Sequence, residues 1–448
     1  MSIVADLSVL KAKKQAYSSE SVRFEGPDGE LCRFVNAYNV FRKRHRSKDN
    51  AKIELMMNRS LAADEKSRRL KDFYVEQATL EKNFLKANPS SYAWVLENER
   101  LSEYYGELFV LHWGREMPAD LYEEAVAHQP RLISNAGMSH YYGYLSTYLF
   151  RADDREELAL FQEALLPGIA IPEEAARLRA LIELQQRKIE GQPYDEAQYG
   201  QEFSYFFRQY EREIHRAKVD AFIKQTAALP AEKRDMVKLV GGGEDIWQRE
   251  QYVGKVLPTV HHAWCADLLR RDWEATREQL AAARKRLAAI RIETAPSTLG
   301  TKVGALPNGA ELYQAGDPPL DTFLSALRAA HPGKALLLDI WAPWCGPCLY
   351  DMQNSAANLQ KLREMDVEVV YLCVADGTNP QTWQQKVAEL DLFAPQVFLG
   401  PELSTAIMRF FDLQGYPSHV FLDKSGQYHP GLVHSISRID FGTLEEKL

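Results

Sequence analysis

The sequence predicts an α+β protein of several domains, in which a mostly α-helical N-terminal region precedes an α/β domain at the C-terminus. Two observations favour this fold class. With 448 residues, the chain is too long for one hydrophobic core, because domains usually hold about 100–200 residues. The hydrophobic pattern also changes: amphipathic helical segments give way near residue 319 to short buried runs that alternate with helices. Such alternation is typical of a sheet with parallel strands.

The composition is that of an ordinary globular protein, with 46% hydrophobic and 26% charged residues. The formal net charge is −8 and no basic stripe carries interleaved aromatic side chains, so we expect no nucleic-acid partner. The most apolar run, residues 335–344, is short and contains Asp339, whereas a membrane span needs about 20 apolar residues. We therefore expect no membrane span in this chain.

The N-terminus does not have the pattern of a secretory signal peptide. The first ten residues contain no basic segment, and Lys11, Lys13 and Lys14 follow them at once. These features predict that the protein stays in the cytoplasm or that the sequence lacks its leader.

Residues 1–60 have weak periodicity and form a poorly defined N-terminal segment. Within it, residues 21–35 are predicted to form a small hairpin, because Gly26-Pro27-Asp28-Gly29 supplies turn residues between apolar positions. These apolar positions are Val22, Phe24, Leu31 and Phe34.

Residues 61–290 are predicted to form a helical domain. Apolar side chains recur at helical spacing, and prolines interrupt the pattern near the expected helix ends. No fixed-period repeat is present, so the sequence does not support a solenoid. The expected helices are Asp64–Lys86, Tyr92–Trp113, Pro118–Ala127, Ser139–Phe150, Glu173–Glu190, Phe203–Leu229 and Val260–Ile290.

Residues 291–318 are rich in glycine and proline, and we expect a linker that ends in a hairpin leading into the next domain. Residues 319–448 are predicted to form the α/β domain. Its expected strands are Ala335–Trp341, Val367–Val374, Gln396–Leu399, Ser418–Leu422 and, at an edge, Gln427–His434. Its expected helices are Asp321–Ala330, Cys348–Met365, Thr382–Leu390 and Thr405–Phe411.

The chemistry is predicted from two closely spaced cysteines, Cys345 and Cys348, which follow the first buried strand of this domain and open the next helix. A helix N-terminus stabilises a thiolate through its unpaired amides and its dipole, and a thiolate is the nucleophile in disulfide exchange. The spacing lets Cys348, one turn inside the helix, reach back to Cys345. Gly346 permits the tight turn, and Pro347 suits the first helical turn, where it removes no intrahelical hydrogen bond.

Two other interpretations of the cysteine pair fit less well. A structural zinc site would need a second cysteine pair or a suitable histidine pair, and the adjacent His261 and His262 point in different directions on a helix. Two incidental core cysteines would explain neither the preceding Trp344 nor the Gly-Pro insert at a junction of strand and helix. The motif therefore favours a redox-active centre.

Residues 338–348, with the sequence LDIWAPWCGPC, resemble the active-site strand and loop of thioredoxins. In that family, the Asp six residues before the first Cys is buried and helps to deprotonate the second Cys, and Asp339 occupies this position. A carboxyl group within an apolar strand is expected to have a raised pKa, which suits proton exchange near neutral pH. The alternative for Asp339 is a hydrogen-bonding role at the end of the strand.

A second segment, Gly415 to Gly426, resembles the strand that follows the cis-proline of thioredoxin-like folds. The resemblance implies that Pro417 is cis, faces the cysteine pair and removes an amide near the nucleophile. It also implies that Tyr416 offers backbone groups to a substrate peptide. We expect Tyr416 to bind substrate together with Trp344, Gly346 and Pro347.

Residues 369–376, followed by Asn379-Pro380-Gln381-Thr382-Trp383, are similar to an extra segment of the TlpA-like (ResA-like) cell-envelope thiol–disulfide reductases. This resemblance covers about residues 300–448 and implies a location in the cell envelope or periplasm. Two features depart from the family. Leu349 stands where thioredoxins usually carry Lys, and no charged partner is evident on the central strand, where Tyr371 and Cys373 lie.

The resemblance and the motif together predict a thiol–disulfide oxidoreductase that reduces protein disulfides. The Cys345 thiolate attacks a substrate disulfide, and Cys348, deprotonated with help from Asp339, resolves the mixed disulfide. The Gly-Pro insert is that of thioredoxin, whose potential of about −270 mV favours reduction. We expect no metal and no organic cofactor. The expected partners are a protein disulfide as substrate and an upstream thiol reductant.

Two alternatives share the fold. A disulfide isomerase or oxidase would have a more oxidising potential. A redox-switched binding or scaffold protein would use the helical region as its working part. Within the enzyme interpretation, the helical region either selects substrates, because its Tyr and Trp side chains suit peptide surfaces, or serves as a scaffold or dimerisation module.

Overall fold

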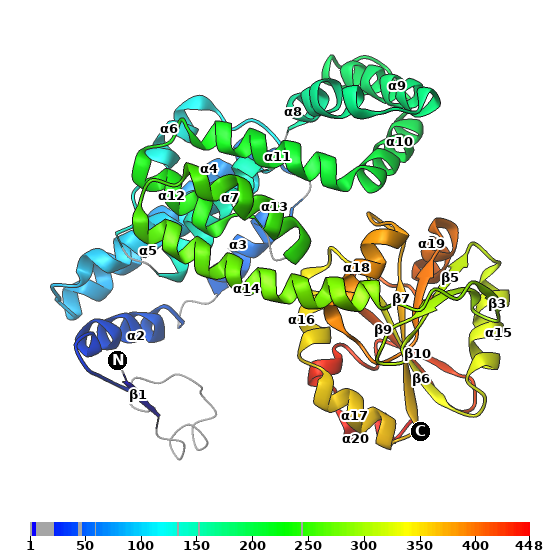
Figure 1. The fold of residues 1–448 in the computed structure, drawn as a ribbon. Coiled ribbons are helices and arrows are strands. Elements are labelled where there is room, and N and C mark those ends of the chain that lie inside the picture. Colours follow the sequence, from blue (N-terminus) through cyan, green and yellow to red (C-terminus); the bar gives the residue numbers. More distant parts are fainter. Residues whose placement is uncertain are drawn as a thin grey trace. The chain divides into compact units, whose positions relative to one another are not determined.

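The computed structural model describes residues 2–5, 22–43, 47–58, 60–131, 134–150, 153–242 and 245–448 (Figure 1). It confirms the predicted fold class, because a mostly helical N-terminal region precedes a C-terminal domain built on a mixed sheet. The chain divides into two compact units. Unit 1 comprises Met1–Ala164, Arg216–Gly242 and Lys255–Leu269, and unit 2 comprises Leu165–His215, Gly243–Gly254 and Arg270–Leu448.

Unit 1 is a set of packed helices with one small sheet. The sheet pairs β1 (Ser2–Ala5) with β2 (Val22–Glu25) in antiparallel register. The helices are α2 (Gly29–Lys43), α3 (Ser47–Met57), α4 (Ala63–Ala87), α5 (Ala93–Leu111), α6 (Ala119–Ala127), η1 (Ala136–Tyr142), α7 (Gly143–Phe150), α8 (Asp154–Ala159) and α12 (Ala231–Val240).

The hairpin predicted for residues 21–35 is wrong in its second half. Val22–Glu25 is a strand, but its partner is β1, and the residues after the turn form helix α2. The physical reason is helical spacing: Phe34 and Tyr38, one turn apart, are buried in a cluster with Phe84 and Leu96. Ser21 and the other residues between the two strands lie outside the described part of the chain.

Unit 2 contains an eight-stranded sheet with the order β10-β9-β6-β7-β8-β5-β4-β3. Its four middle strands, from β6 to β5 in this order, run parallel, and an antiparallel pair continues the sheet at each edge. The strands are β3 (Ala295–Ser297), β4 (Gly300–Ala305), β5 (Glu311–Gly316), β6 (Ala335–Trp341), β7 (Val367–Cys373), β8 (Gln396–Leu399), β9 (Ser418–Leu422) and β10 (Tyr428–Pro430).

Helices cover this sheet and close one hydrophobic core over it. They are α15 (Leu320–Ala330), α16 (Gly346–Gln353), α17 (Ala356–Glu364), α18 (Pro380–Leu390), α19 (Pro401–Phe410) and α20 (Phe441–Glu445). The helix predicted for Cys348–Met365 is divided into α16 and α17, which are separated at Asn354 and Ser355. Three interior strands begin and end at the predicted residues: Ala335–Trp341, Gln396–Leu399 and Ser418–Leu422.

The segment 291–318 is part of the main sheet. It supplies β3, β4 and β5, and β5 pairs in parallel with β8 from Leu312 to Gly316. The expected linker is thus fixed by backbone hydrogen bonds along most of its length. A hairpin is present within it, since β4 and β5 are antiparallel neighbours.

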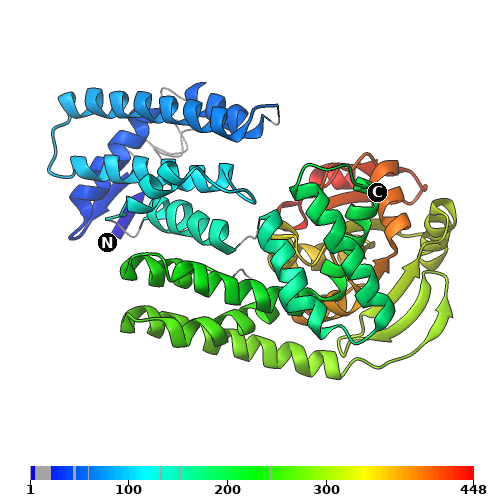
Figure 2. The same ribbon diagram turned by 90° about the horizontal axis from the view of Figure 1, so that it is seen from above.

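The compact units do not follow the predicted boundary at residue 290. Helices α9 (Pro172–Ile189) and α10 (Glu196–Gln209), which lie side by side in Figure 2, belong to unit 2. The division falls inside α11 (Glu211–Thr226), α13 (Ile246–Val256) and α14 (Ala263–Ala288). Part of the predicted helical domain therefore belongs to the same compact unit as the sheet.

Polar contacts connect α14 and the residue before α13 to helix α18 of the sheet unit. The Lys386 ammonium of α18 lies 2.6 Å from both the Asp245 and the Glu389 carboxylates, and its side chain is only 1% exposed. Arg286 of α14 donates to the carbonyl oxygens of Ala388 and Glu389, at 2.5 and 2.9 Å. Lys386 thus joins carboxylates from two segments, and Arg286 joins α14 to the end of α18.

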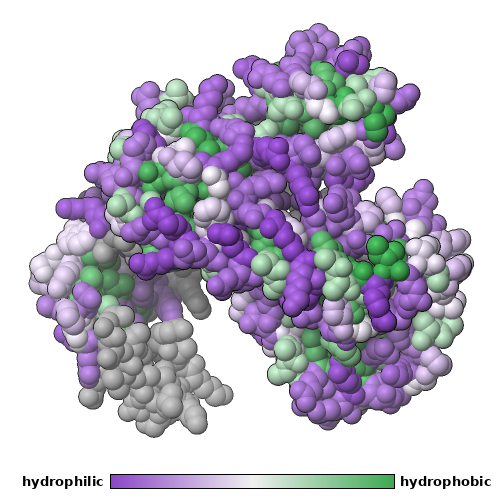
Figure 3. Space-filling model, viewed as in Figure 1, coloured by the Kyte–Doolittle hydropathy of each residue, from purple (hydrophilic) through white to green (hydrophobic). Residues whose placement is uncertain are grey.

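The surface of the molecule is more hydrophilic than its core (Figure 3). Figure 3 shows that the viewed face is mostly hydrophilic, with apolar residues in small groups. In the described part of the chain, no helix combines the length and the apolar character that crossing a membrane requires.

Lys386→Ala is expected to lower the free energy of unfolding by about 3–5 kcal/mol, because it removes a buried cation and leaves two partly buried carboxylates unpaired. The matched control is Lys424→Ala. Lys424 is 42% exposed and 3.8 Å from Asp366, and such a pair contributes only about 0–1 kcal/mol. Urea unfolding of the full chain, followed by tryptophan fluorescence, measures both. Equal transition midpoints for the two variants would contradict this account.

Candidate active site

The two cysteines lie where strand β6 meets helix α16. All seven residues of β6 are buried, and the strand has β7 on one side and β9 on the other. Cys345 is the N-cap of α16, and Pro347 lies in the first turn. The backbone amide of Cys348 donates to the Cys345 sulfur at 3.2 Å. The sequence folds this way because an apolar strand cannot continue through Gly346-Pro347, whereas a helix can begin there.

Cys345 and Cys348 form a disulfide, with their Cα atoms 5.3 Å apart. In this oxidised form they are only 3% and 1% exposed. The structure therefore brings together the pair that the motif predicted. Cys373 is a separate, fully buried thiol on β7, and burial raises its pKa well above the usual value. A thiol of this kind is unreactive at neutral pH.

The predicted substrate-binding residues surround the disulfide on its exposed side. Trp344 is 53% exposed, and Gly346 and Pro347 are exposed next to it. The rings of Trp344 and Tyr416 meet edge to face, with their centroids 5.6 Å apart. These side chains give the buried disulfide an aromatic rim that another protein can contact.

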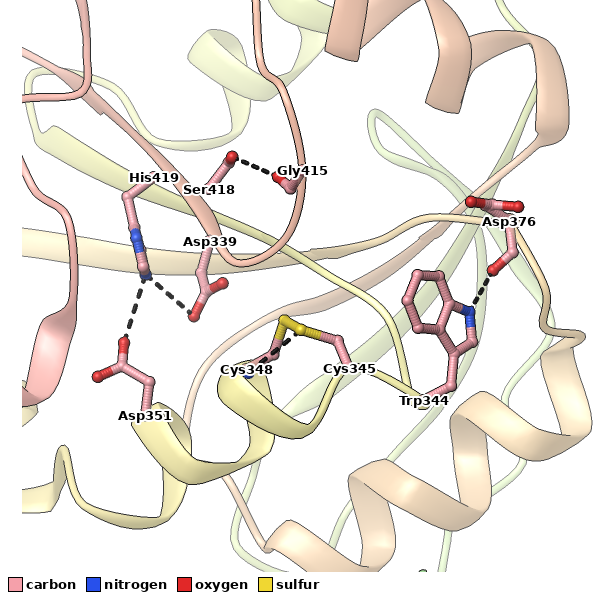
Figure 4. Close-up of a disulfide and its surroundings, with 9 residues drawn as sticks. All are labelled: Asp339, Trp344, Cys345, Cys348, Asp351, Asp376, Gly415, Ser418 and His419. Carbon is pink, nitrogen blue, oxygen red and sulfur yellow. Dashed lines mark hydrogen bonds and ion pairs between the residues drawn. A yellow bond between two sulfur atoms is a disulfide. The ribbon is translucent and has the colours of Figure 1, made fainter. Parts of the chain in front are cut away.

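The Tyr416–Pro417 peptide bond is cis, as the resemblance implied. Ser418, the next residue, pairs with Ile340 near the end of β6, so Pro417 lies beside the point where β6 leads into the cysteine loop. Ser418 also donates its hydroxyl hydrogen to the Gly415 carbonyl at 2.6 Å, which closes this turn (Figure 4). Because proline has no N–H group, this backbone presents no amide donor at that position.

The loop after β7 holds Trp344 in place. The indole Nε1 donates to the Asp376 carbonyl at 2.7 Å (Figure 4). The next residue, Gly377, has φ +62°, and a Cβ built there would lie 2.7 Å from Trp344 Nε1. Only glycine fits this position without displacing the indole or straining the backbone. This loop belongs to the segment that resembled the TlpA-like extra segment.

Asp339 lies behind the disulfide, inside the sheet. Its strand neighbours are Tyr371 on β7 and His419 on β9. The Asp339 carboxyl is 1% exposed, and one of its oxygens, Oδ1, has no hydrogen-bond partner among the described residues. Its other oxygen lies 3.7 Å from His419 Nε2. The expectation that Asp339 is buried near the second cysteine agrees with this geometry (Figure 4).

Two residues of this site, His419 and Asp351, were not among the predicted site residues. Asp351 lies one turn after Cys348 on α16, and its carboxylate is 3.6 Å from His419 Nε2. Burial opposes the charge of the His419 imidazole, but the neighbouring carboxylates of Asp339 and Asp351 outweigh it and raise the pKa of His419. The charged partner that is not evident on the central strand β7 is thus supplied by β9.

Hydrogen bonds fix the Asp351 carboxylate. It accepts from the Ser435 hydroxyl at 2.6 Å and from the backbone amides of Ile436 and Ser437, both at 2.8 Å. Burial works to raise the pKa of Asp351, but these donors prevail and lower it. Asp351 is therefore ionised at neutral pH.

A pocket opens next to the cysteine loop within unit 2. The redox loop contributes one wall, the loop after β7 and the start of α18 a second, and helical segments before the sheet a third. The Glu211 carboxylate in this third wall accepts from the Thr382 hydroxyl at 2.7 Å and from the Gln248 amide at 3.0 Å. Lining residues are Glu211, Asp245, Gln248, Pro343, Trp344, Gly346, Leu349, Gly377, Thr378 and Thr382.

No protein-family model matches the chain, and no curated protein matches it either. Among solved structures, the thioredoxin domain of a thiol–disulfide oxidoreductase from Bacteroides vulgatus is similar over 26% of this chain and 81% of its own, with 16% identity and a TM-score of 0.23. A secreted disulfide oxidoreductase of Mycobacterium tuberculosis is similar over 27% and 83%, with 18% identity and a TM-score of 0.21.

A thiol:disulfide interchange protein from Bacteroides sp. is similar over 35% of this chain and 88% of its own, with 14% identity and a TM-score of 0.24. Identities and TM-scores this low carry no argument about activity. The thioredoxin-like fold of the C-terminal domain follows from the strand order, the cysteine pair at the start of α16 and the cis bond before Pro417.

Gly377→Ala is expected to displace the Trp344 indole from the Asp376 carbonyl. Gly333→Ala is the matched control, because Gly333 has a similar φ of +73° but no atom within 4 Å of an added Cβ. Both variants carry backbone strain of about 1 kcal/mol. The indole N–H resonance of Trp344, assigned with Trp344→Phe, should shift only in Gly377→Ala. The same shift in both variants would mean that backbone strain, and not contact, moves the ring.

Proposed function

We propose that this protein is a thioredoxin-like thiol–disulfide oxidoreductase that reduces protein disulfides by dithiol exchange through Cys345 and Cys348. The observation that carries the proposal is the disulfide at the N-terminus of α16, directly after the buried strand that contains Asp339. A structural role would not call for an exposed aromatic rim around a bond that is itself nearly buried.

The first step belongs to Cys345. In the reduced enzyme, its sulfur caps α16, where the helix dipole and the Cys348 amide stabilise a thiolate. This thiolate attacks one sulfur of the substrate disulfide. A mixed disulfide between Cys345 and the substrate forms, and the other substrate sulfur leaves as a thiolate.

The second step belongs to Cys348. Its thiol gives a proton to the Asp339 carboxylate, and the resulting thiolate attacks the Cys345 sulfur. The Cys345–Cys348 disulfide forms, and the substrate leaves with both of its sulfurs reduced. Figure 4 shows the Asp339 carboxyl on the side of Cys348, which suits this transfer. An upstream thiol reductant then returns the enzyme to its dithiol form.

The reducing direction is proposed from the Gly346-Pro347 insert, which matches that of thioredoxin. An isomerase or oxidase would have a potential near −180 or −120 mV, compared with about −270 mV for thioredoxin. Equilibration of the full chain with glutathione buffers of known potential separates these alternatives, and a value near −120 mV would contradict a reductase.

Substrate docking is proposed at Trp344, Gly346, Pro347 and Tyr416. The exposure of Trp344, Gly346 and Pro347 next to the disulfide, and the contact of the Tyr416 ring with Trp344, support this assignment. A substrate chain that lies along the cis-proline turn can hydrogen-bond to the backbone of Tyr416, while Trp344 supplies apolar contact area. Pro417 offers no amide that would compete for the substrate sulfur.

The helical region is proposed to influence which substrates reach Cys345. Glu211 of α11 and Gln248 of α13 line the same pocket as Trp344 and Gly346, which supports a role in selection. A scaffold or a redox-switched binding protein is the alternative, and in that case a Cys345→Ser protein would keep both its partner and its biological role.

The cell envelope is proposed as the working compartment, by resemblance to the TlpA-like reductases alone. The cytoplasm is the alternative. Fractionation of cells that make the native gene product tests the location, and recovery solely in the cytosol would contradict the envelope.

Cys345→Ser is expected to reduce insulin with dithiothreitol no faster than the uncatalysed reaction, because the nucleophile is gone. Cys348→Ser should instead accumulate mixed disulfides with its substrates, since the resolving thiol is missing. Mass spectrometry of the trapped complexes would identify these substrates. Cys373→Ala is the control and should retain activity. An active Cys345→Ser, or trapping by Cys345→Ser in place of Cys348→Ser, would reverse the assignment.

Gln248→Trp is expected to lower kcat/KM for a protein disulfide at least tenfold while leaving the reduction of a small aromatic disulfide unchanged, because the larger side chain fills the pocket. Gln198→Trp, at an exposed position of α10, is the matched control. Steady-state kinetics on both substrates measures the difference. Equal protein-disulfide kinetics for the two variants would exclude this pocket from substrate selection.

A further inference from the structure

A buried group of charges lies behind the disulfide, and the mechanism above uses only one of its members. Asp339 comes from β6, His419 from β9 and Asp351 from α16. Figure 4 shows the imidazole next to both carboxyl groups, with Asp339 on the side nearer the disulfide. The group therefore connects the strand that leads into the cysteine loop with the helix that carries Cys348.

One ring nitrogen is shared by both carboxylates. His419 Nε2 lies 3.7 Å from Asp339 Oδ2 and 3.6 Å from Asp351 Oδ2, and the His419 side chain is 0% exposed. Within the described part of the chain, neither ring nitrogen of His419 has a hydrogen-bond partner. These are ion-pair distances, slightly longer than hydrogen bonds, so small movements of the ring can favour either carboxylate.

Two carboxylates this close in a buried site repel each other unless a cation lies between them. Asp351 stays ionised through its own hydrogen bonds, so the proton affinity of Asp339 depends on the charge of His419. A neutral imidazole would leave Asp339 facing only the negative charge of Asp351. The Asp339 carboxylate, which is the proton acceptor proposed for Cys348, would then have no positive neighbour to balance its charge.

The other titratable groups at this site are Tyr371 and the two cysteines. The Tyr371 hydroxyl on β7 is buried and has no hydrogen-bond partner among the residues that the structure describes, and burial, reinforced by Asp339 and Asp351, raises its pKa well above the usual value. Tyr371 is therefore neutral throughout the working pH range. His419 is the cation that faces Asp339 from the elements packed against it in the described structure.

We propose that His419, as an imidazolium held between Asp339 and Asp351, is a positioning residue of the resolving step: it supplies the positive charge beside the Asp339 carboxylate, the group that takes the Cys348 proton. The proposal rests on the proposed function. The Cys348 proton moves to Asp339, the Cys348 thiolate bonds to the Cys345 sulfur, and the Cys345–substrate bond breaks to release a substrate thiolate.

The test uses the reduced full chain and 5,5′-dithiobis(2-nitrobenzoic acid) in stopped flow. One thionitrobenzoate is released when Cys345 attacks, and a second when Cys348 resolves the mixed disulfide, so the two steps appear as separate phases. In His419→Gln the first phase should be unchanged. In the pH–rate profile of the second phase, the acidic limb should move up by about one pH unit. At a pH on that limb, the mixed disulfide is then resolved about tenfold more slowly.

The direction of the shift follows from charge. Removing the imidazolium removes the positive neighbour that favours the Asp339 carboxylate, so the carboxyl binds its proton more tightly and is ionised only at higher pH. The matched control is His429→Gln on β10. His429 pairs with Asp423 at 2.8 Å and is not part of the proposed machinery, so its profile should follow that of the wild type.

A second measurement does not depend on how the variant folds. In the wild-type protein, the NMR resonances of the His419 imidazole should show a protonated ring above pH 6.5, the usual histidine pKa. A neutral ring at pH 6, an unshifted second phase in a folded His419→Gln, or an equal loss in both phases would overturn the proposal. A wild-type protein without either phase would refute the proposed function itself, and the NMR titration would still report on His419.

Discussion

The redox site depends on strand β6, which must be buried along its full length and must end where α16 begins. Parallel pairing with β7 and antiparallel pairing with β9 fix both sides of this strand, so its last residue, Trp341, cannot shift along the sheet. The loop from Ala342 then delivers Cys345 to the N-cap of α16. The other parts of the site are positioned by this junction. Trp344 lies on its exposed side, and Asp339 lies in the buried strand that leads into it.

Burial of this strand places the Asp339 carboxyl in an apolar environment, and a residue of the neighbouring strand compensates its charge. A carboxyl group at position 339 is costly in an apolar sheet unless charge or hydrogen bonds compensate it. The compensation comes from His419 at the directly paired position of β9. Lys386 shows the same principle elsewhere in unit 2, where two carboxylates hold one buried ammonium. In both places, charges from separate segments meet in the interior and fix how those segments pack.

Much of the C-terminal domain could be predicted because its signals are local. The apolar run before Asp339, the Gly346-Pro347 insert and the motif around Pro417 each occupy a few consecutive residues. His419 was missed for a physical reason: its partner Asp339 is adjacent only across two paired strands, 80 residues apart in sequence. A search for a charged residue opposite Asp339 on either neighbouring strand could have found it.

The helical region illustrates the limits of periodicity. A pattern such as that of Phe203–Leu229 indicates a helix, but it does not show that the segment is divided at Tyr210 into α10 and α11. Periodicity also cannot assign a helix to a unit. That assignment depends on pairs such as Lys386 with Asp245, which lie far apart in sequence. The same limit applies to residues 291–318, where β5 joins the main sheet by pairing with β8, far away in sequence, and β4 and β3 follow by pairing in turn.

The capping of α16 by Cys345 also affects the reduction potential of the cysteine pair. The sulfur that accepts the Cys348 amide carries a full negative charge in the thiolate and almost none in the disulfide, so the helix end stabilises the reduced protein more than the oxidised one. A form stabilised in this way releases electrons less readily. The contact that makes Cys345 a better leaving group and a more abundant thiolate therefore also makes the cysteine pair less reducing. The Cys348 amide therefore increases the reactivity of Cys345 and lowers the reducing power of the pair.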